Sequence, residues 1–231
     1  MSAPHRPAFF ALIPLAACVL AACGPQQTPS VPAAPSTPDA PRPATPEPGA
    51  GAPAGAAGAA PLLEDAAIGL RLDPVPELAP RDPGAGDGYL DGGGWNALAE
   101  SGAQGQTLGA FVLAGSDDIT TGELRIGRSD APEAVRTCQA VPPGAAGPAE
   151  PAEIGGVAFS RFRAGDAGMS HFQTIEAYRA VHRGQCVAID LVVSGTRPEV
   201  YDPPRQAPFD TETALARLRG TLPALHWSQM P

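Results

Sequence analysis

The chain has 231 residues, a formal net charge of −9 and an apolar fraction of 43%. All 15 basic residues are Arg, against 24 Asp and Glu. Binding to a phosphate backbone needs clustered cations, so this acidic balance disfavours nucleic acid as a partner. Aromatic residues are few, so we expect a core of Leu, Val, Ile and Ala.

The first 22 residues have the layout of an export signal. His5 and Arg6 lie in a short polar start, and an uncharged apolar run follows from Ala8 to Leu20. This run is too short to cross a bilayer as a helix, but it suits the apolar region of a signal peptide. The next residues, Leu20-Ala21-Ala22-Cys23, resemble the bacterial lipobox, in which the Cys is acylated before cleavage.

We therefore predict a lipoprotein signal peptide over residues 1–22 and lipidation at Cys23. The motif Leu15-Ala16-Ala17-Cys18 is a second candidate, but it would leave a much shorter apolar region. An ordinary secretory peptide, with both Cys residues uninvolved, is the other alternative. Gly24 resembles the pattern that sorts lipoproteins to the outer membrane. The expected location is the cell envelope, with the lipid anchor in the outer membrane and the protein facing the periplasm.

Residues 23–61 are predicted to be the lipidated Cys and a disordered tether. Pro recurs at short intervals from Pro25 to Pro61, mixed with Ala, Ser, Thr and Gly. Pro fixes φ and removes amide donors, so the segment is expected to be extended, with a reach of roughly 100 Å. A ligand for a proline-recognition domain is the alternative to a spacer. Residues 62–231 are then expected to form a single globular domain.

Alternation of apolar and polar residues predicts several strands in this domain. It has the period of a half-buried strand in segments 68–72, 108–114, 123–127 and 157–161. A short helix is predicted over 132–138, with Pro in its first turn. Residues 74–105 are predicted to be a long loop, and the Pro-rich run 141–151 is predicted to break the chain again.

The C-terminal half carries the clearest patterns. Segment 171–182 contains apolar residues at helical spacing as well as β-forming residues, whereas 187–193 alternates cleanly. Arg183-Gly184 between them has the chemistry of a turn, so we predict a long β-hairpin. Asp210 is expected to cap a helix that Gly220 and Pro223 end, and a short strand is expected over 225–227.

These elements predict an α+β fold. We expect an antiparallel sheet of five or six strands, with one main C-terminal helix packed on one face.

Several short motifs follow one another between residues 155 and 222. They are Ala167-Gly168-Met169-Ser170-His171, Tyr178-Arg179, His182-Arg183-Gly184-Gln185-Cys186, Tyr201-Asp202-Pro203 and Phe209-Asp210. This order resembles a group of uncharacterised proteobacterial envelope lipoproteins. The resemblance implies a sheet-and-helix arrangement similar to that of PsbP, and it carries over no catalytic residue.

Cys138 and Cys186 are the only thiols left once the signal peptide is removed and Cys23 is lipidated. Unpaired thiols are unusual in an oxidising periplasm, so we predict a disulfide between them. For a loop of this size the chain-entropy contribution is roughly 4 kcal/mol. A redox or metal pair is the alternative, but a separation of 48 positions lacks Cys-x-x-Cys geometry.

Four residues are candidates for binding: Arg161, Arg163, His171 and Arg179. With Arg183, the three Arg residues fall on neighbouring predicted strands, where they could receive a carboxylate or an acidic partner. Cross-strand pairing with Glu176 or Asp190 is the alternative that we favour.

His171 is also the centre of a hydrolase hypothesis, because Ser170 and Asp166 lie close to it in the sequence. Against that hypothesis, adjacent Ser and His on a strand point to opposite faces. The chain contains no G-x-S-x-G motif and no H-E-x-x-H motif. We therefore assign no catalytic residue.

Calcium is a further possibility, because Asp82, Asp87 and Asp91 lie among glycines and offer oxygen ligands. Their spacing fits neither an EF-hand nor a repeated Gly/Asp nonapeptide, so we expect turns there. No metal site and no cofactor are predicted.

The leading hypothesis is therefore a membrane-anchored envelope lipoprotein that acts as a non-enzymatic binding or assembly accessory. Its partner would be an envelope protein, a glycan or a lipid. The alternative is a periplasmic hydrolase with a non-standard site near His171.

Overall fold

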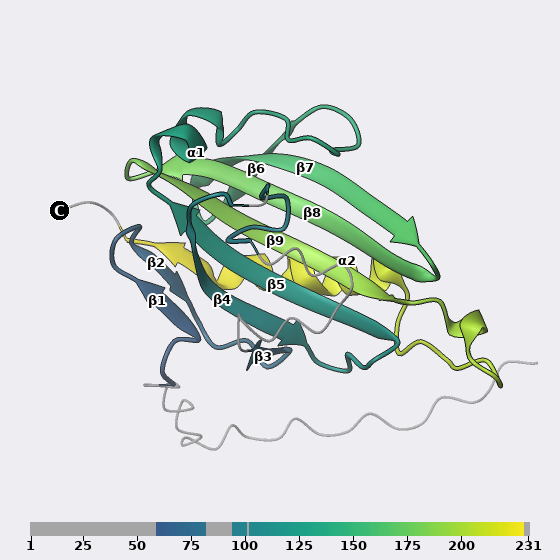
Figure 1. Ribbon diagram of the computed structural model, residues 1–231. Coiled ribbons are helices and arrows are strands. Elements are labelled where there is room, and N and C mark those ends of the chain that lie inside the picture. The colour runs from purple at the N-terminus through teal and green to yellow at the C-terminus, as the bar shows by residue number, and fades with distance from the viewer. Residues whose placement is uncertain (1–58, 82–93, 101, 229–231) are drawn as a thin grey trace, which may run out of the picture. The chain divides into compact units, whose positions relative to one another are not determined.

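The computed structural model describes residues 59–81, 94–100 and 102–228. The predicted signal peptide, Cys23 and nearly all of the tether lie outside the described residues, as do the three Asp residues of the calcium hypothesis. Within the described part, the strands form two antiparallel sheets, one of seven strands and one of three (Figure 1).

The larger sheet has the strand order β3-β4-β5-β9-β8-β7-β6. In chain order its strands are β3 (Leu78–Arg81), β4 (Gln106–Leu113), β5 (Thr120–Ser129), β6 (Glu150–Ile154), β7 (Val157–Gly168), β8 (His171–His182) and β9 (Gln185–Thr196). β7 pairs with β8, and β8 pairs with β9. β9 also pairs with β5, in the middle of the sheet.

The smaller sheet joins the two ends of the domain. Its strands are β1 (Leu63–Asp65), β2 (Leu70–Leu72) and β10 (Leu225–Trp227), with β2 in the middle. The helices are α1 (Pro132–Thr137) and α2 (Thr211–Thr221), with short 3₁₀ turns η1 (Pro198–Val200) and η2 (Leu222–Ala224). No helix in the described residues is long and apolar enough to cross a membrane.

The predicted long hairpin is confirmed as β8 and β9. The two strands pair without interruption from His171–Thr196 to His182–Gln185. Arg183 and Gly184 in the turn both have positive φ, 49° and 74°. A two-residue turn of this kind twists in the same sense as the strands, so it fits a long, regular hairpin.

The main core lies between the larger sheet and α2. Val187, Ile189, Leu191 and Val193 of β9 are fully or almost fully buried on this side. Alternate residues of a strand share a face, so the period of two in the sequence produces this apolar surface. Against it α2 packs the buried residues Ala214, Leu215 and Leu218.

Asp210 caps α2 as predicted. Its carboxylate accepts a hydrogen bond from the Thr213 amide at 2.7 Å, which satisfies one of the free donors of the first turn. The helix passes through Gly220 and ends at Thr221. The predicted stop at Gly220 is therefore wrong by one residue, and Pro223 lies in the 3₁₀ turn that follows.

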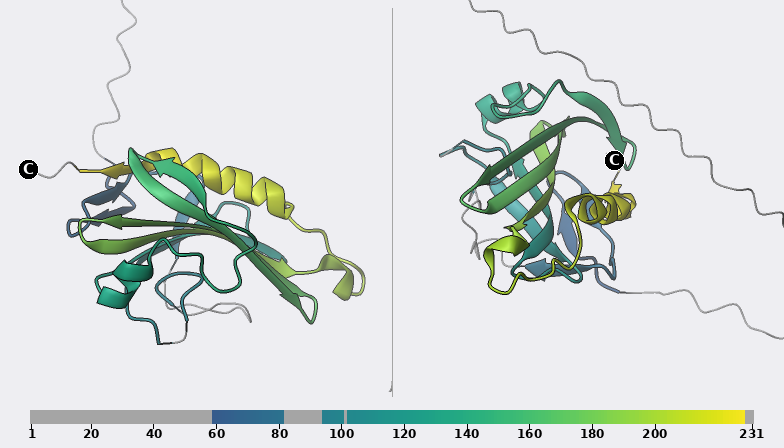
Figure 2. Two further views of the ribbon diagram at one scale, coloured as in Figure 1. Left: turned by 90° about the horizontal axis from the view of Figure 1, so that it is seen from above. Right: turned by 90° about the vertical axis from the view of Figure 1, so that its right-hand side faces the viewer.

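The opposite face of the larger sheet is covered differently. Figure 2 shows α2 along one face, with α1 and the segments next to it on the other face. A smaller apolar cluster on this second side contains Phe162, Ile175 and Val192, with Ala97 and Leu98 packed against it. Both faces of the central strands are therefore buried.

The predicted α+β class is confirmed, although the larger sheet has seven strands rather than five or six. The two unexpected strands, β3 and β6, lie at its edges, in segments that were expected to be loop or broken chain. Each contains a Pro, Pro80 in β3 and Pro151 in β6. Pro is tolerated at an edge because its missing amide donor leaves no gap in the ladder there.

Candidate functional site

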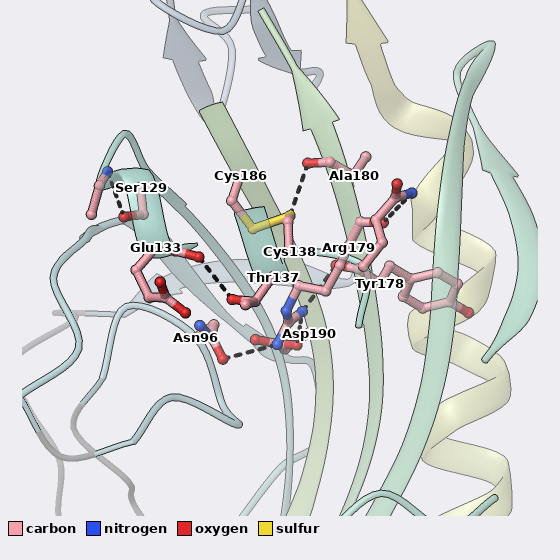
Figure 3. The surroundings of a disulfide bond; sticks show 12 residues. Asn96, Ser129, Glu133, Thr137, Cys138, Tyr178, Arg179, Ala180, Cys186 and Asp190 are labelled. Atoms are coloured by element: carbon pink, nitrogen blue, oxygen red, sulfur yellow. Dashed lines mark hydrogen bonds and ion pairs between the residues drawn. A yellow bond between two sulfur atoms is a disulfide. The ribbon is translucent and has the colours of Figure 1, made fainter. Parts of the chain in front are cut away.

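A disulfide joins Cys138 to Cys186, as predicted from the sequence (Figure 3). Cys138 directly follows α1. Cys186 is the second residue of β9, next to the β8–β9 turn. The two side chains are 7% and 2% exposed. The bond therefore ties α1 to the face of the sheet that lies opposite α2.

Apart from this bond, α1 has few means of attachment. It has six residues, none of them buried, and no side chain caps its N-terminus. Such a short helix is marginal without tertiary contacts. We infer that the disulfide is the main element that holds α1 over the sheet.

The segment from residue 94 to 100 is attached by a buried ion pair. Arg179 Nη1 donates to Asp190 Oδ1 at 2.6 Å, and the two side chains are 7% and 1% exposed. Asp190 Oδ2 accepts from the Ala97 amide at 2.8 Å. Asn96 Oδ1 accepts from Arg179 Nη2 at 3.0 Å (Figure 3). Both buried charges are thus hydrogen-bonded by the segment that covers them, as buried charges require.

Trp95 packs closely against Gly105 and Gly127. A Cβ atom at Gly105 would lie 2.2 Å from Trp95 Cγ, and one at Gly127 would lie 1.9 Å from the Trp95 carbonyl oxygen. Only Gly leaves room for the indole and its backbone at these positions. Trp95 is 7% exposed, and its Nε1 is buried with no hydrogen-bond partner among the described residues.

A cavity of about 740 Å³ lies beside Trp95. Its lining comes from the described segments 95–100 and 102–104, from 131–143, and from Phe162, Arg179 and Cys186 of the sheet. Most of these side chains are apolar. The volume falls in the range of roughly 300–1,000 Å³ that is typical of small-molecule sites.

The charged side chains of the lining are Glu100, Glu133 and Arg179. Glu133 pairs with Arg136, and Arg179 pairs with Asp190. The only cation in the described lining is therefore already paired with a carboxylate, so this part of the lining has no unpaired positive charge to offer an anion.

The structure does not bring the predicted binding residues together. Arg161 lies on the α2 side of the sheet, where it contacts Glu150 and approaches Glu176 to 4.0 Å. Its register partner on β8 is Tyr178, the neighbour of Arg179, and neighbours on a strand face opposite sides. Arg179 alone of the four lines the cavity.

Arg163 and Arg183 are also apart from Arg179. Arg163 lies opposite Glu176 in the register, on the same face as Arg161. Arg183 lies in the β8–β9 turn and donates to the Ser228 carbonyl oxygen at 2.6 Å. The favoured alternative, pairing of these Arg residues with Glu176 or Asp190, is confirmed for Arg161 and Arg179.

Glu176 is the centre of a second buried cluster, under α2. It is 3% exposed and accepts from Tyr178 Oη at 3.0 Å and from Arg219 Nη1 at 2.8 Å. Burial, and then the charge of Glu176, raise the pKa of Tyr178 to about 12. Tyr178 therefore stays protonated at neutral pH and donates to Glu176, so this cluster links β8 to α2.

His171 lies at the start of β8, with its Nδ1 3.2 Å from Thr196 Oγ1. Ser170 lies in the β7–β8 turn with a φ of 73°, and the Asp166 carboxylate accepts from the Ala167 amide. These contacts belong to the hairpin and the next strand, and they do not favour a hydrolytic site. No group of three or more His, Cys, Asp or Glu in the described ranges could hold a metal ion.

Comparison with protein-family models, with curated proteins and with solved structures finds no match to this chain. The resemblance to envelope lipoproteins therefore stays a prediction from the sequence, and the functional argument depends on the geometry of the cavity.

Sequence reasoning identified Cys138, Cys186 and Arg179 but did not place Trp95 or Asn96 in a site. One signal was available, since Trp95-Asn96 follows a run of glycines in a chain with only two Trp residues.

Proposed function

We propose that this protein is a membrane-anchored lipoprotein of the bacterial envelope whose α+β domain binds a ligand without catalysing a reaction. The observation that carries the proposal is the cavity of about 740 Å³ between α1, residues 94–100 and the sheet. Its apolar lining and its few polar groups are typical of a binding site for a small molecule.

Two further features support the envelope location. The Cys138–Cys186 disulfide is of a kind that persists in oxidising compartments and is rare in the cytosol. The lipobox at Cys23 and the Pro-rich tether would hold the domain at a membrane while leaving it free to reach ligands. An outer-membrane anchor facing the periplasm is the specific location that we propose.

The anchor is tested by mass spectrometry of the mature N-terminus from a Gram-negative host. We expect a fatty-acylated Cys23, loss of acylation in Cys23→Ser, and normal acylation in Cys18→Ser. An unmodified N-terminus elsewhere in the chain, or loss of acylation in Cys18→Ser alone, contradicts the proposed anchor.

The binding function is tested with Nile red, an uncharged dye whose fluorescence rises in apolar sites. We expect saturable binding of one dye per chain. Ala134→Trp places a large side chain in the cavity wall and should abolish this binding. Ala216→Trp is the matched control, because Ala216 is exposed on α2, away from the cavity lining.

Absence of saturable dye binding to the folded wild-type chain would contradict a binding role for the cavity. Equal binding by the two Trp variants would place the dye elsewhere and would contradict it as well.

A further inference from the structure

We infer that the cavity takes residues 29–38 of the chain's own tether, with their prolines packed against its apolar lining. This inference rests on the proposed binding function and names the occupant that another ligand must displace. The spacing of the prolines, the chemistry of the lining and the length of the tether carry it.

The prolines of residues 29–38 recur at every third position: Pro29, Pro32, Pro35 and Pro38. A polyproline II helix has three residues per turn, so this spacing places all four rings on one face of such a helix. Segments with a proline face bind aromatic-lined grooves, because their extended form is largely set before binding. This stretch of the tether therefore has the pattern of a ligand, which a spacer does not need.

The lining of the cavity suits an apolar segment. Trp95 and Phe162 supply aromatic rings that are 7% and 1% exposed, whereas Val141 is 53% exposed. Val141 is one of four large apolar side chains that the described residues leave exposed, and an apolar occupant would cover it.

The lining can also satisfy an extended backbone. The carbonyl groups of a polyproline II segment make no hydrogen bonds within the segment, so they need donors outside it. Gln104 lines the cavity and is exposed. Its side-chain amide can donate two hydrogen bonds and so replace water that a docked carbonyl would lose.

Charge favours this stretch over the next one. Residues 29–38 contain no charged side chain, whereas residues 39–48 contain three. Arg179, the only cation in the described lining, is already paired with Asp190. A charged segment would lose its hydration here without gaining a free partner, so the uncharged stretch is the better occupant.

The tether is long enough for this contact. Twenty residues, 39–58, separate Pro38 from the first described residue. An extended chain covers about 3.3 Å per residue, so they reach up to roughly 65 Å. A domain of this size has a radius of gyration of roughly 15 Å, so the cavity lies within reach. Because segment and cavity belong to one chain, their effective concentration is high and even weak docking is populated.

The test uses the mature chain with Cys23→Ser, here called the parent chain, which keeps the whole tether and the whole domain without the lipid. The spacing variant combines Pro29→Ala, Pro32→Ala, Pro35→Ala and Pro38→Ala. The control variant changes four prolines outside this spacing and combines Pro25→Ala, Pro43→Ala, Pro48→Ala and Pro53→Ala. All these positions precede the described domain, so neither variant alters its core.

We expect the spacing variant to bind Nile red at least about threefold more tightly than the parent chain. A docked segment lowers the fraction of free cavities, and the apparent affinity falls by that fraction. The control variant should bind the dye as the parent chain does.

A nitroxide label on Ala34→Cys, between the prolines, locates the segment directly. In ¹H–¹⁵N spectra of the parent chain it should broaden the amide signals of Ala134 and Val141, which line the cavity. The signal of Ala216, which is exposed on α2, should stay sharper. The spacing variant with the same label should lose this difference.

Equal dye affinity of the spacing variant and the parent chain would overturn this inference, as would equal broadening at Ala134 and Ala216. A mixture of labelled chain and unlabelled ¹⁵N chain tests the source of the segment. Selective broadening in that mixture would assign the segment to a second copy and overturn docking within one chain.

These failures differ from failure of the proposed function. If Nile red still binds saturably, the cavity remains a binding site and only its occupant is wrong. Absence of dye binding to both the parent chain and the spacing variant would contradict the binding function itself.

Discussion

The carboxylate of Asp190 is the most deeply buried charge on the cavity side of the sheet, with a side chain that is 1% exposed. It accepts hydrogen bonds from Arg179 and from the Ala97 amide, and Arg125 of β5 lies opposite it in the register. A buried ion pair contributes little net stability, but removal of one partner leaves an uncompensated charge. Removal of one partner should therefore lower the stability of the domain by more than the pair itself contributes.

We expect Arg179→Met to lower the free energy of unfolding by about 3–5 kcal/mol, because the buried Asp190 carboxylate would lose the guanidinium that donates to it. Arg179→Met combined with Asp190→Leu should lose less than the sum of the two single changes. Urea denaturation measures all three variants. Arg136→Met is the control, because Arg136 forms a highly exposed pair with Glu133 and should change stability little.

His182 gives a second prediction at the scale of one residue. Its ring packs edge-on against Trp227, with centroids 4.9 Å apart, and its Nε2 is buried without a partner among the described residues. Burial, and then the charge of Arg183, lower the pKa of His182 in the folded state. The unfolded chain therefore binds a proton more readily than the folded chain does.

The stability that comes from the neutral ring is complete above the unfolded pKa of about 6.5. It is lost as the pH falls through that value toward the lower pKa of the folded state. We expect the urea midpoint to drop between about pH 7.5 and pH 5, and to drop less in His182→Gln. His226→Gln is the control, because it removes the same ring from an exposed position.

At the scale of elements, α1 and α2 depend on different forces. α2 has a capped N-terminus and a buried apolar stripe. α1 has neither, and the disulfide takes their place. Removal of the disulfide should therefore affect the two helices very differently.

We expect Cys138→Ser/Cys186→Ser to lower the free energy of unfolding by about 4 kcal/mol, the chain-entropy value for a loop of this length. Amide hydrogen exchange should show complete loss of protection in α1, whereas β8, β9 and α2 should keep measurable protection that falls only with the global free energy of unfolding. A reducing agent should give the same pattern in the wild type. Protection in α1 that falls no further than protection in the sheet would contradict a local role for the disulfide.

At the scale of the whole domain, the two faces of the larger sheet have different roles. One face packs against α2 and supplies most of the core, while the other face forms the floor of the cavity. Changes in the α2 core should therefore alter stability without altering the affinity of the folded protein for a ligand.

Leu218→Ala tests this separation. Leu218 is fully buried under α2, so its truncation should cost about 2–5 kcal/mol in unfolding free energy. Nile red affinity, measured where the variant is still fully folded, should equal that of the wild type. A weaker affinity there would show that the two faces of the sheet are coupled.

Local patterns in the sequence were enough to predict the long β8–β9 hairpin, the Asp210 cap and the α+β class. Each depends on residues close in the chain: alternating apolar residues, a two-residue turn, and a side chain that bonds an amide three positions away. The disulfide also followed from the sequence, since only two thiols remained after the predicted lipidation at Cys23.

The edge strands and the cavity depended on contacts between distant parts of the chain. β3 and β6 contain Pro and pair on one side only, so no local signal distinguishes them from loop. Asn96 meets Arg179 across 83 positions. Arg161 lies opposite Tyr178 in the register, and strand pleating sends the adjacent Arg179 to the other face of the sheet. Propensity and periodicity act over a few residues, whereas a cavity forms where segments far apart in the sequence come together around one sheet.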